Sequence, residues 1–344
     1  MTNSSRNNYI TIAKALGIIL MVIGHSGCPT ALGKFIYLFH MPLFFVCSGY
    51  FFKEITNRAS LITFFKKRIN GLYIPFIKWG LLFLLLHNVF RYMNITVGEY
   101  YQKQDYIRQF VRVLTMTDYE LLIRPFWFIK ELFFVSLTVA SISMIRTIIF
   151  PKVGTLILLL ISLTVAIVMK FAPPIPLIGD CSLLFLGTSY FYSGILIQKY
   201  KDTIPFTTYT MIISFLVVLT GSILFTGIID MRYTTIGIIV PYYLLSLSGV
   251  LMIFCISKKS ENIFINSALY YIGNHTMPIL ALNLLALKIG NLIKIWIYSL
   301  HMRSLSSYTV IYDYNSYFWV LYAIIGITIP LLVNYLYNKL VLHQ

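Results

Sequence analysis

Two ionisable side chains, Lys14 and His25, stand eleven positions apart in the first apolar stretch of the sequence. On a helix this spacing is about three turns, so both side chains project from one face, about 16 Å apart along the axis. Neutral imidazole accepts a proton near pH 7. An ionisable group inside an apolar span is costly, so we take it as a candidate functional residue. His25 is therefore the candidate general base. The alternatives are that Lys14 snorkels to the membrane surface and that His25 is a hydrogen-bonded packing residue.

The second apolar stretch adds a histidine, His40, near its beginning. The connection between the stretches is short, which favours an antiparallel hairpin with His25 and His40 at similar depth. His40 is expected to orient His25, to hold the acceptor, or only to pack. Pro42 frees a backbone carbonyl, and Ser48-Gly49 permits close approach of another helix or of a ligand chain. A kink of purely structural purpose is the alternative.

The composition predicts that membrane-spanning helices position these residues. Of 344 residues, 58% are hydrophobic and 11% are charged, and the mean hydropathy is +0.81, whereas soluble domains contain about 25% charged residues. The apolar runs are continuous rather than alternating, which excludes an outer-membrane β-barrel. We therefore expect an all-α, polytopic integral membrane protein. At about 20 residues per span, it holds about ten transmembrane helices in a single domain, residues 1–344, with no sizeable soluble domain.

The apolar runs and the basic residues between them predict a topology. We expect spans near residues 8–28, 35–53, 72–91, 125–149, 153–171, 181–199, 207–229, 235–256, 268–296 and 316–338. Basic residues concentrate in connections of one parity, which the positive-inside rule assigns to the cytoplasm together with both termini. Residues 92–124 fall on the outer side of the membrane by this count, although they carry further arginines. Their mix of Tyr, Ile and Arg predicts an amphipathic helix on the membrane surface.

Several functional classes are excluded by the same patterns. The net charge of +16 is spread in ones and twos at the ends of apolar runs, which is typical of membrane topology and not of nucleic-acid binding. The four scattered cysteines indicate neither a disulfide framework nor a metal site. The amino terminus lacks the features of a removed signal peptide, and no internal repeat typical of many transporters is evident.

The sequence around these residues resembles the membrane acyltransferase family 3. Lys14, ten intervening residues and His25-Ser26 are followed by YLFHMPLFFVCSGYFF over residues 37–52, and weaker similarity continues at 64–68, 72–76, 125–133 and 271–280. The branch most similar contains fucose 4-O-acetylases and other exopolysaccharide acetyltransferases. The resemblance implies a ten-helix enzyme of the bacterial cytoplasmic membrane. Its expected donor is an acyl-CoA, namely acetyl-CoA, and its expected acceptor is a cell-surface glycan or the lipid-linked precursor of that glycan.

The resemblance also implies site residues, which fall on Lys14, His25 and His40. Thr11 stands where many relatives have an aspartate, so an ion pair with Lys14 is missing. The basic repeat after the second span is only partly present, and Asn283 stands where many relatives have a histidine. These departures concern the coenzyme contacts and the ninth span and leave the role of His25 intact.

Donor and acceptor contacts are expected from further charged and aromatic residues. A phosphate-bearing donor from the cytosol needs a basic cluster on the inner face, which Lys66, Lys67 and Arg68 supply unless they only enforce topology. Glu131 is the acidic residue well inside a predicted span, so it should face the bundle and have a partner. Trp127 either lines the acyl or sugar pocket or anchors the helix at the interface.

Two mechanisms and two other functions stay open at this point. In one mechanism His25 deprotonates a sugar hydroxyl for direct transfer, and in the other His25 is acylated first. The alternative function is a lipid-linked saccharide transporter, in which Lys, His and Glu form a substrate or proton path. Arg108, Arg112 and Arg124 leave a membrane glycosyltransferase as a third interpretation.

Overall fold

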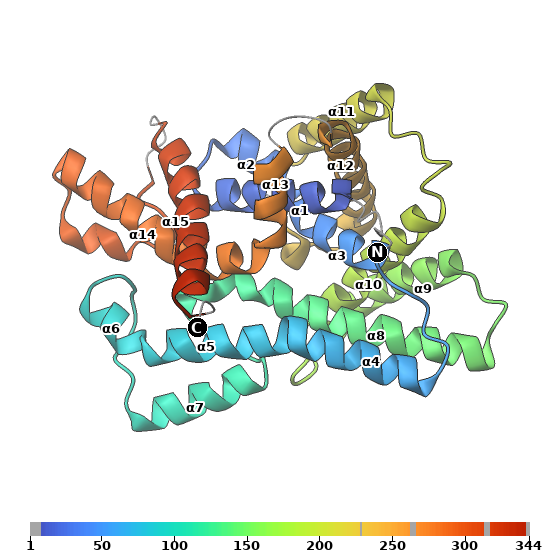
Figure 1. Cartoon of the computed structure of the whole chain (residues 1–344), viewed down its shortest axis with the longest axis horizontal. Helices are drawn as coiled ribbons and strands as arrows, with labels where there is room; N and C mark the ends of the chain where they lie inside the picture. Colours follow the sequence, from blue (N-terminus) through green and yellow to red (C-terminus); the bar gives the residue numbers. More distant parts are fainter. Residues whose placement is uncertain (1–7, 228, 262–265, 313–316, 342–344) are drawn as a thin grey trace. The chain divides into compact units, whose positions relative to one another are not determined.

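The protein is built from α-helices throughout the part of the chain that the computed structural model describes, residues 8–227, 229–261, 266–312 and 317–341. Within these residues the only extended pairing is an isolated bridge between Ile175 and Gly179. The all-α prediction is therefore confirmed (Figure 1). The helices are α1 Asn8–His25, α2 Thr30–Tyr37, α3 His40–Tyr50, α4 Arg58–Arg68, α5 Ile74–Leu85, α6 His87–Tyr92, α7 Lys103–Leu114, α8 Trp127–Ile149, α9 Thr155–Val168, α10 Cys181–Lys199, α11 Thr208–Leu224, α12 Ile239–Ser260, α13 Asn266–Asn274, α14 Thr276–Tyr298 and α15 Phe318–Val341.

Most of the predicted spans coincide with helices long and apolar enough to cross a membrane. Eight such segments occur in the described chain: Asn8–His25, Thr30–Tyr50, Arg58–Leu85, Leu121–Ile149, Cys181–Lys199, Ile239–Ser260, Thr276–Tyr298 and Phe318–Leu340. Two shorter apolar helical segments, Thr155–Phe171 and Thr208–Leu224, lie where two further spans are expected. The chain is thus a polytopic membrane protein, and the count of ten and the cytoplasmic termini stay predictions.

Prolines explain where the predicted spans are interrupted. The second span breaks between α2 and α3 because the ring of Pro42 clashes with a continuing helix at the carbonyl four residues earlier, Leu38. That carbonyl accepts a hydrogen bond from Ser246 Oγ at 2.6 Å instead. The ninth span breaks in the same way, since Pro278 lies four residues after Asn274, the last residue of α13.

The third span begins earlier than predicted and contains a wide turn. Helix α4 starts at Arg58, where Asn57 caps it by accepting from Ser60 N at 2.9 Å. It continues into α5 through a π-helical turn, Ile69–Tyr73, which ends two residues before Pro75. A wider turn accommodates a proline that lacks an N–H donor, and such turns are frequent at functional sites. The basic cluster therefore lies on a helix rather than in a loop.

The chain forms two compact units, each made of separate stretches of sequence. The first contains residues 1–36, 79–126 and 259–344, and the second contains residues 37–78 and 127–258. Within the first unit, α1 packs against α13, α14 and α15, and α14 packs against α15 (Figure 1). Because each unit interleaves with the other along the sequence, neither is a sequential domain, and the single-domain assignment stays a prediction.

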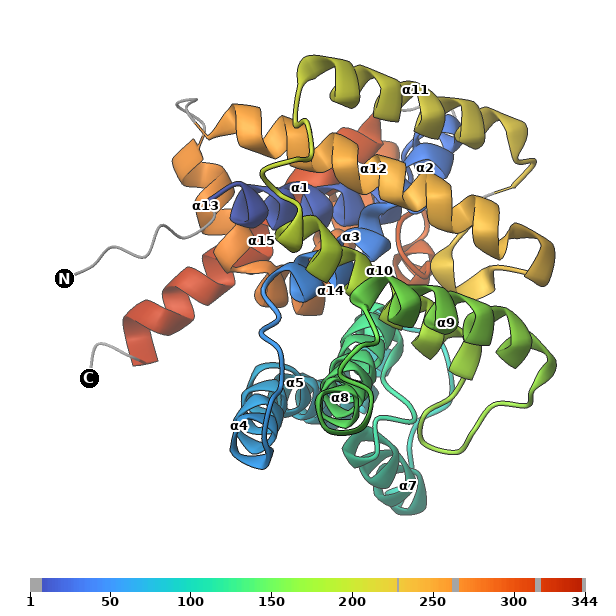
Figure 2. The same ribbon diagram turned by 90° about the vertical axis from the view of Figure 1, so that its right-hand side faces the viewer.

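Helix α10 is the centre of the second unit. It packs against α3, α8 and α9, and Figure 2 shows α9 and α10 side by side. Gly49 of α3 and Gly194 of α10 allow this contact, because a Cβ at Gly49 would lie 1.9 Å from the carbonyl oxygen of Phe191. A Cβ at Gly194 would lie 2.1 Å from the carbonyl oxygen of Val46. The expected close approach of a helix at Ser48-Gly49 is therefore confirmed.

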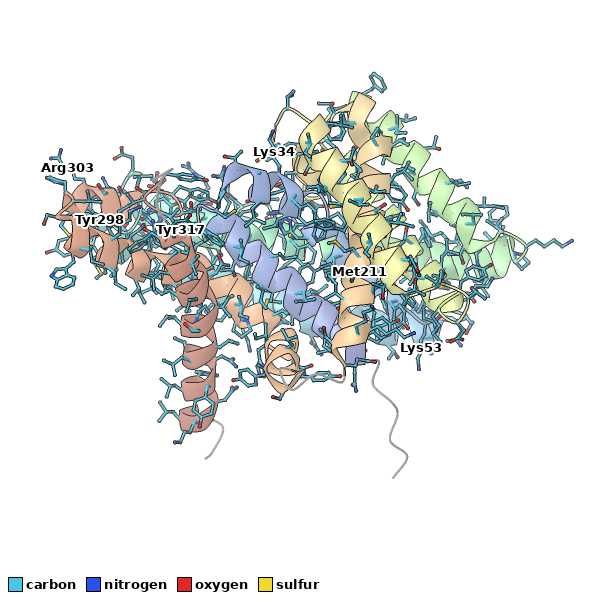
Figure 3. All side chains as sticks on the ribbon, turned by 90° about the horizontal axis from the view of Figure 1, so that it is seen from above. Lys34, Lys53, Met211, Tyr298, Arg303 and Tyr317 are labelled. Atoms are coloured by element: carbon cyan, nitrogen blue, oxygen red, sulfur yellow. The ribbon has the colours of Figure 1, made fainter. Side chains whose placement is uncertain are left out.

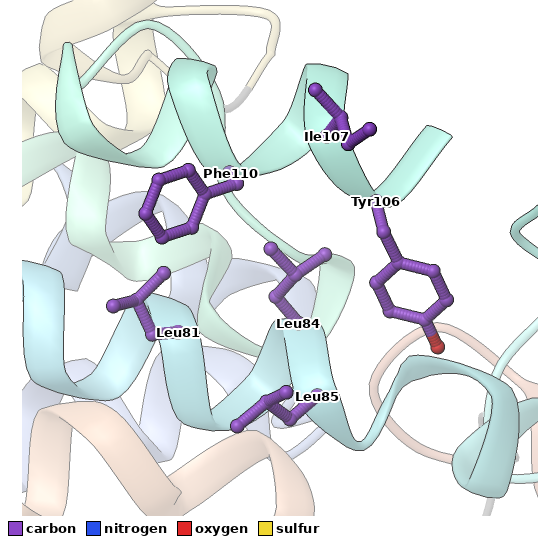
Figure 4. A pocket seen from close by; sticks show the side chains of 6 residues that line it. All are labelled: Leu81, Leu84, Leu85, Tyr106, Ile107 and Phe110. Carbon is purple, nitrogen blue, oxygen red and sulfur yellow. The ribbon is translucent and has the colours of Figure 1, made fainter. Parts of the chain in front are cut away.

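The connection between α5 and α8 contains the predicted amphipathic helix. It is α7, whose apolar residues line an open groove against α5, with Leu81, Leu84 and Leu85 on one side and Tyr106, Ile107 and Phe110 on the other (Figure 4). Ile107 and Phe110 are more than two fifths exposed, and Lys103, Arg108 and Arg112 lie on the same helix. This division of apolar and basic residues suits a membrane surface, the location that the sequence predicts.

A buried histidine anchors this connection. His87 Nδ1 lies 2.8 Å from Glu120 Oε2, and Nε2 lies 3.1 Å from the carbonyl oxygen of Glu99. The imidazole stacks on the ring of Tyr101 with 3.4 Å between ring centroids. The cluster ties both ends of the segment from residue 87 to residue 120 together. The sequence does not predict this contact, because 33 positions separate His87 from Glu120.

The carboxyl group of Glu120 makes the stability of this segment depend on pH. Burial is the main cause that raises its pKa above the ordinary 4.5, and the hydrogen bond from His87 lowers it in part. The pKa of Glu120 is higher in the folded protein than in the unfolded protein. The stability that the protonated carboxyl group contributes is therefore complete below about pH 4.5 and is lost as pH rises through the folded pKa. We expect amide protection of residues 87–120, corrected for intrinsic exchange, to fall more between pH 4.5 and neutral pH in the wild type than in Glu120→Gln. Identical profiles would contradict this assignment.

Candidate functional site

Lys14 and His25 lie on one uninterrupted helix, as their spacing predicts. Helix α1 runs from Asn8 to His25, and both side chains are half-buried. The helix is held closely against α13, since a Cβ at Gly273 would lie 2.1 Å from the carbonyl oxygen of Thr11. The Gly-Asn-His stretch near residue 273 therefore packs against the helix that carries the candidate base.

A small polar cavity in the first unit is lined in part by the two residues that follow His25 in the sequence. Its volume is about 10 Å³, enough for about one water molecule or one hydroxyl group. Ser26, Gly27 and Lys294 line it together with Val310, Ile311, Tyr312, Phe318, Trp319 and Tyr322. Gly27 has φ +77°, a left-handed conformation that glycine adopts without strain, and it turns the chain immediately after α1.

Three polar side chains of α14 hold the segment that contributes Val310 and Ile311 to this cavity. Lys288 Nζ donates to the carbonyl oxygen of Leu305 at 3.2 Å, and Lys294 Nζ donates to that of Ile311 at 3.0 Å. Asn291 lies between them and accepts from Ile311 N at 3.0 Å and from the hydroxyl of Tyr322 at 2.6 Å. The side chains recur every three residues, so one helix face fixes the segment from residue 305 to residue 311, which begins in the short 3-10 helix Met302–Ser306.

The second unit contains the other histidine of the opening motif. His40 begins α3, is buried, and meets the ring of Tyr37 edge to face at 5.0 Å between centroids. Ser48, one of the predicted substrate contacts, is half-buried on the same helix, beside the glycine that contacts α10. His25 belongs to the first unit and His40 to the second, so their predicted pairing stays a prediction.

Charged residues surround the beginning of α8, where Trp127 and Glu131 lie one turn apart. The guanidinium carbon of Arg232 lies 5.1 Å from the centroid of the Trp127 ring. Glu131 is 5% exposed, and its Oε2 atom has no hydrogen-bond partner among the described residues. Lys170 pairs with Asp180 at 3.2 Å, and Asp180 also caps α10. A buried, unsatisfied carboxylate oxygen is rare and indicates a ligand or a water molecule that completes it.

The predicted donor-binding cluster occupies the last turn of α4. Lys66 and Lys67 are exposed, whereas Arg68 is half-buried and lies 4.9 Å above the centroid of the Phe64 ring. The Nε atom of Arg68 has no hydrogen-bond partner among the residues described. Three cations within one helical turn suit a ligand with several phosphates, and the π-helical turn follows directly.

Some residues of these sites are not singled out by the sequence. In the sequence, Lys288 and Lys294 are two cations within an apolar span. Only the fold shows that backbone carbonyl groups of residues 305–311 accept hydrogen bonds from them. Arg146 lies in the last turn of α8 and pairs with Glu54, which is 92 positions earlier in the sequence. The sequence could have indicated Arg146 only as a cation inside an apolar run, which is a reason to consider a functional role.

A family described as an acyltransferase domain, acyltransferase family 3, matches residues 7–339, nearly the whole chain. No curated protein matches the chain. No solved structure matches it either.

Proposed function

We propose that this protein, which belongs to the acyltransferase family 3, moves an acyl group from acyl-CoA to a hydroxyl group of a cell-surface polysaccharide or of its lipid-linked precursor. The acyl group in this proposal is acetyl, and the location is the bacterial cytoplasmic membrane. Membership of the family makes the protein a membrane acyltransferase, and it does not favour the transporter alternative. The single observation that carries the finer proposal is the helix α1, which has Lys14 and His25 on one face and leads directly into Ser26 and Gly27, two residues that line a hydroxyl-sized cavity.

In the proposed reaction His25 is the general base. Its imidazole accepts the proton of the acceptor hydroxyl while the oxygen attacks the thioester carbonyl carbon. The new C–O bond forms, the C–S bond breaks, and CoA leaves as a thiolate that takes the proton back from the imidazolium of His25. In the second route His25 attacks first and carries the acyl group to the acceptor. Lys66, Lys67 and Arg68 hold phosphates of the donor in both routes.

The acceptor side of the proposal rests on the cavity and the aromatic residues around it. A volume of about 10 Å³ admits a hydroxyl group but not a sugar ring. Tyr312, Phe318 and Trp319 line the same cavity, and aromatic faces suit the C–H groups of a sugar ring. The ring of the acceptor therefore lies outside the cavity against these side chains, with one hydroxyl inserted.

Replacement of Trp319 by alanine tests this arrangement. Loss of one aromatic platform is expected to raise the KM for the acceptor by about fivefold to thirtyfold, with a smaller change in kcat, because it removes about 1–2 kcal/mol of contact with the bound sugar. Trp296→Ala is the matched control, since Trp296 is 83% exposed and does not line the cavity. A KM for acetyl-CoA that changes by the same factor would contradict the assignment to the acceptor.

The proposed function itself is tested by acetyl transfer. Purified protein in proteoliposomes is supplied with acetyl-CoA labelled in the acetyl group and with surface polysaccharide from the source cells. We expect label on the polysaccharide and an equal amount of free CoA. Release of no CoA with any polysaccharide or lipid-linked precursor would overturn the proposal.

A further inference from the structure

A second polar cavity lies within the second unit, and none of the residues assigned above lines it. It has a volume of about 70 Å³, several times the 10–15 Å³ that one water molecule needs. Arg146 of α8, Thr155 of α9 and Tyr192 of α10 line it with Phe52 and Glu54, which follow α3. Ser143, Leu158 and Ile195 complete the lining.

Two buried donors around this cavity have no partner in the described chain. Tyr192 is 3% exposed, and its hydroxyl oxygen makes no hydrogen bond to a described residue. The same holds for the Nε atom of Arg146. Buried donors are nearly always satisfied, and both of these belong to side chains that line a cavity with room for a ligand.

The beginning of α9 adds a third feature to the cavity. This helix has 14 residues and begins after Gly154, which offers no side-chain cap. Its first residue, Thr155, lines the cavity. The first amide groups of a helix and its dipole attract anions, so an uncapped beginning beside an arginine is an anion-binding arrangement.

The cavity already holds a carboxylate of the chain itself. Arg146 Nη2 forms an ion pair with Glu54 Oε1, which also accepts from Thr147 Oγ1 at 3.3 Å. The Glu54 side chain is 51% exposed, and the neighbouring residue Lys53, labelled in Figure 3, is exposed as well. An exposed carboxylate on a short connection can be displaced by a doubly charged anion.

We propose that this cavity binds a phosphate group of the acyl-CoA donor, with Arg146, Tyr192 and the beginning of α9 as its contacts. The inference rests on the proposed function, since it assigns the anion to the donor.

The cavity is linked to the basic cluster through aromatic contacts. Phe52 lies 5.4 Å from Phe64 between ring centroids, and Arg68 lies over the same Phe64. Both cationic sites therefore serve one extended, multiply charged ligand.

Binding of CoA and of pantetheine, which lacks the phosphates, tests the proposal. Full-length protein is placed in nanodiscs of phosphatidylcholine, and affinities are measured by calorimetry. Arg146→Gln is expected to weaken CoA binding about tenfold to a hundredfold and to leave pantetheine unchanged, because charge-assisted hydrogen bonds to phosphate are strong. Tyr192→Phe removes only the hydroxyl and is expected to weaken CoA binding about threefold to tenfold. Glu54→Gln removes the competing charge and is expected to tighten it about threefold.

The controls separate this inference from the proposed function. Arg112→Gln removes another ion-paired arginine, 3.1 Å from Asp118, and should change nothing. If Arg146→Gln and Tyr192→Phe both bind CoA like the wild type while acetyl transfer continues, the inference is overturned and the proposed function stands. If the wild type neither binds CoA nor transfers acetyl groups, the proposed function fails as well. If phosphatidylglycerol in the nanodiscs binds in an Arg146-dependent manner while CoA binding does not depend on Arg146, the site takes a lipid phosphate and the inference is overturned.

Discussion

Replacement of His25 by alanine is expected to lower the rate of acyl transfer by about a hundredfold to ten-thousandfold. General-base catalysis by a positioned imidazole contributes about this factor, and alanine offers no group that accepts the proton. His25 is half-buried at the last residue of α1, so its truncation leaves no sealed cavity in the core. The measurement is label transfer to polysaccharide in proteoliposomes, normalised to the folded protein recovered after size exclusion.

The control for this substitution is another histidine that lies outside the site. His301 is exposed, and its Nδ1 atom accepts a hydrogen bond from Arg303 N at 3.1 Å. His301→Ala should keep the full rate. A His25→Ala protein that is folded and still acetylates at the wild-type rate would contradict the role of His25.

The same preparation distinguishes the two mechanisms. With labelled acetyl-CoA and no acceptor, the direct route leaves the protein unlabelled. The acyl-enzyme route places label on His25 and releases one CoA for each protein before the acceptor is added. Mass spectrometry of the peptide that contains His25 reads this difference directly.

The parts of the site that the sequence predicts are those that depend on local geometry. Lys14 and His25 share a face because eleven helical residues make about three turns, whatever packs around them. The approach of a helix at Gly49 follows from the absence of a side chain at that position. The sequence identifies only one member of that contact, because the backbone that Gly49 meets is more than a hundred positions away, at Phe191.

The helix boundaries could have been improved from the prolines alone. Pro42, Pro75 and Pro278 each precede or follow a break or a wide turn at the spacing that their missing N–H and their ring require. Hydropathy does not detect the break near Pro42 or the wide turn before Pro75, since one apolar segment continues through each of them. The basic cluster is predicted in a connection for the same reason, and it lies instead on a helix that continues into the span.

The remaining polar residues depend on contacts distant in sequence. Lys294 is part of a cavity wall because it donates a hydrogen bond to the carbonyl oxygen of Ile311. Arg146 is part of the other cavity because it forms an ion pair with Glu54. Neither pair has a local sequence signal. A buried cation in an apolar span indicates that some partner exists, but only the fold identifies a backbone carbonyl in one case and a carboxylate in the other.

Replacement of Gly194 by alanine is expected to prevent normal folding of the second unit. The added Cβ would lie 2.1 Å from the carbonyl oxygen of Val46 and 2.8 Å from the backbone nitrogen of Tyr50. These are backbone atoms of α3 at a helix crossing, so neither can rotate away as a flexible side chain can. The crossing must open along its length, which costs about 3 kcal/mol or more, because overpacking at a rigid contact separates the surrounding atoms as well.

Gly71→Ala is the matched control for this prediction. Gly71 lies in the π-helical turn and has nothing within 4 Å of an added Cβ. The folded yield in detergent and the midpoint of thermal unfolding should fall sharply for Gly194→Ala, by about 6 °C or more, and should be close to the wild type for Gly71→Ala. The comparison controls for the helix propensity of alanine, which is the same in both variants. Equal yields and midpoints for the two variants would mean that α3 and α10 are not in backbone contact, and the position of Ser48 beside that contact would then have to be revised.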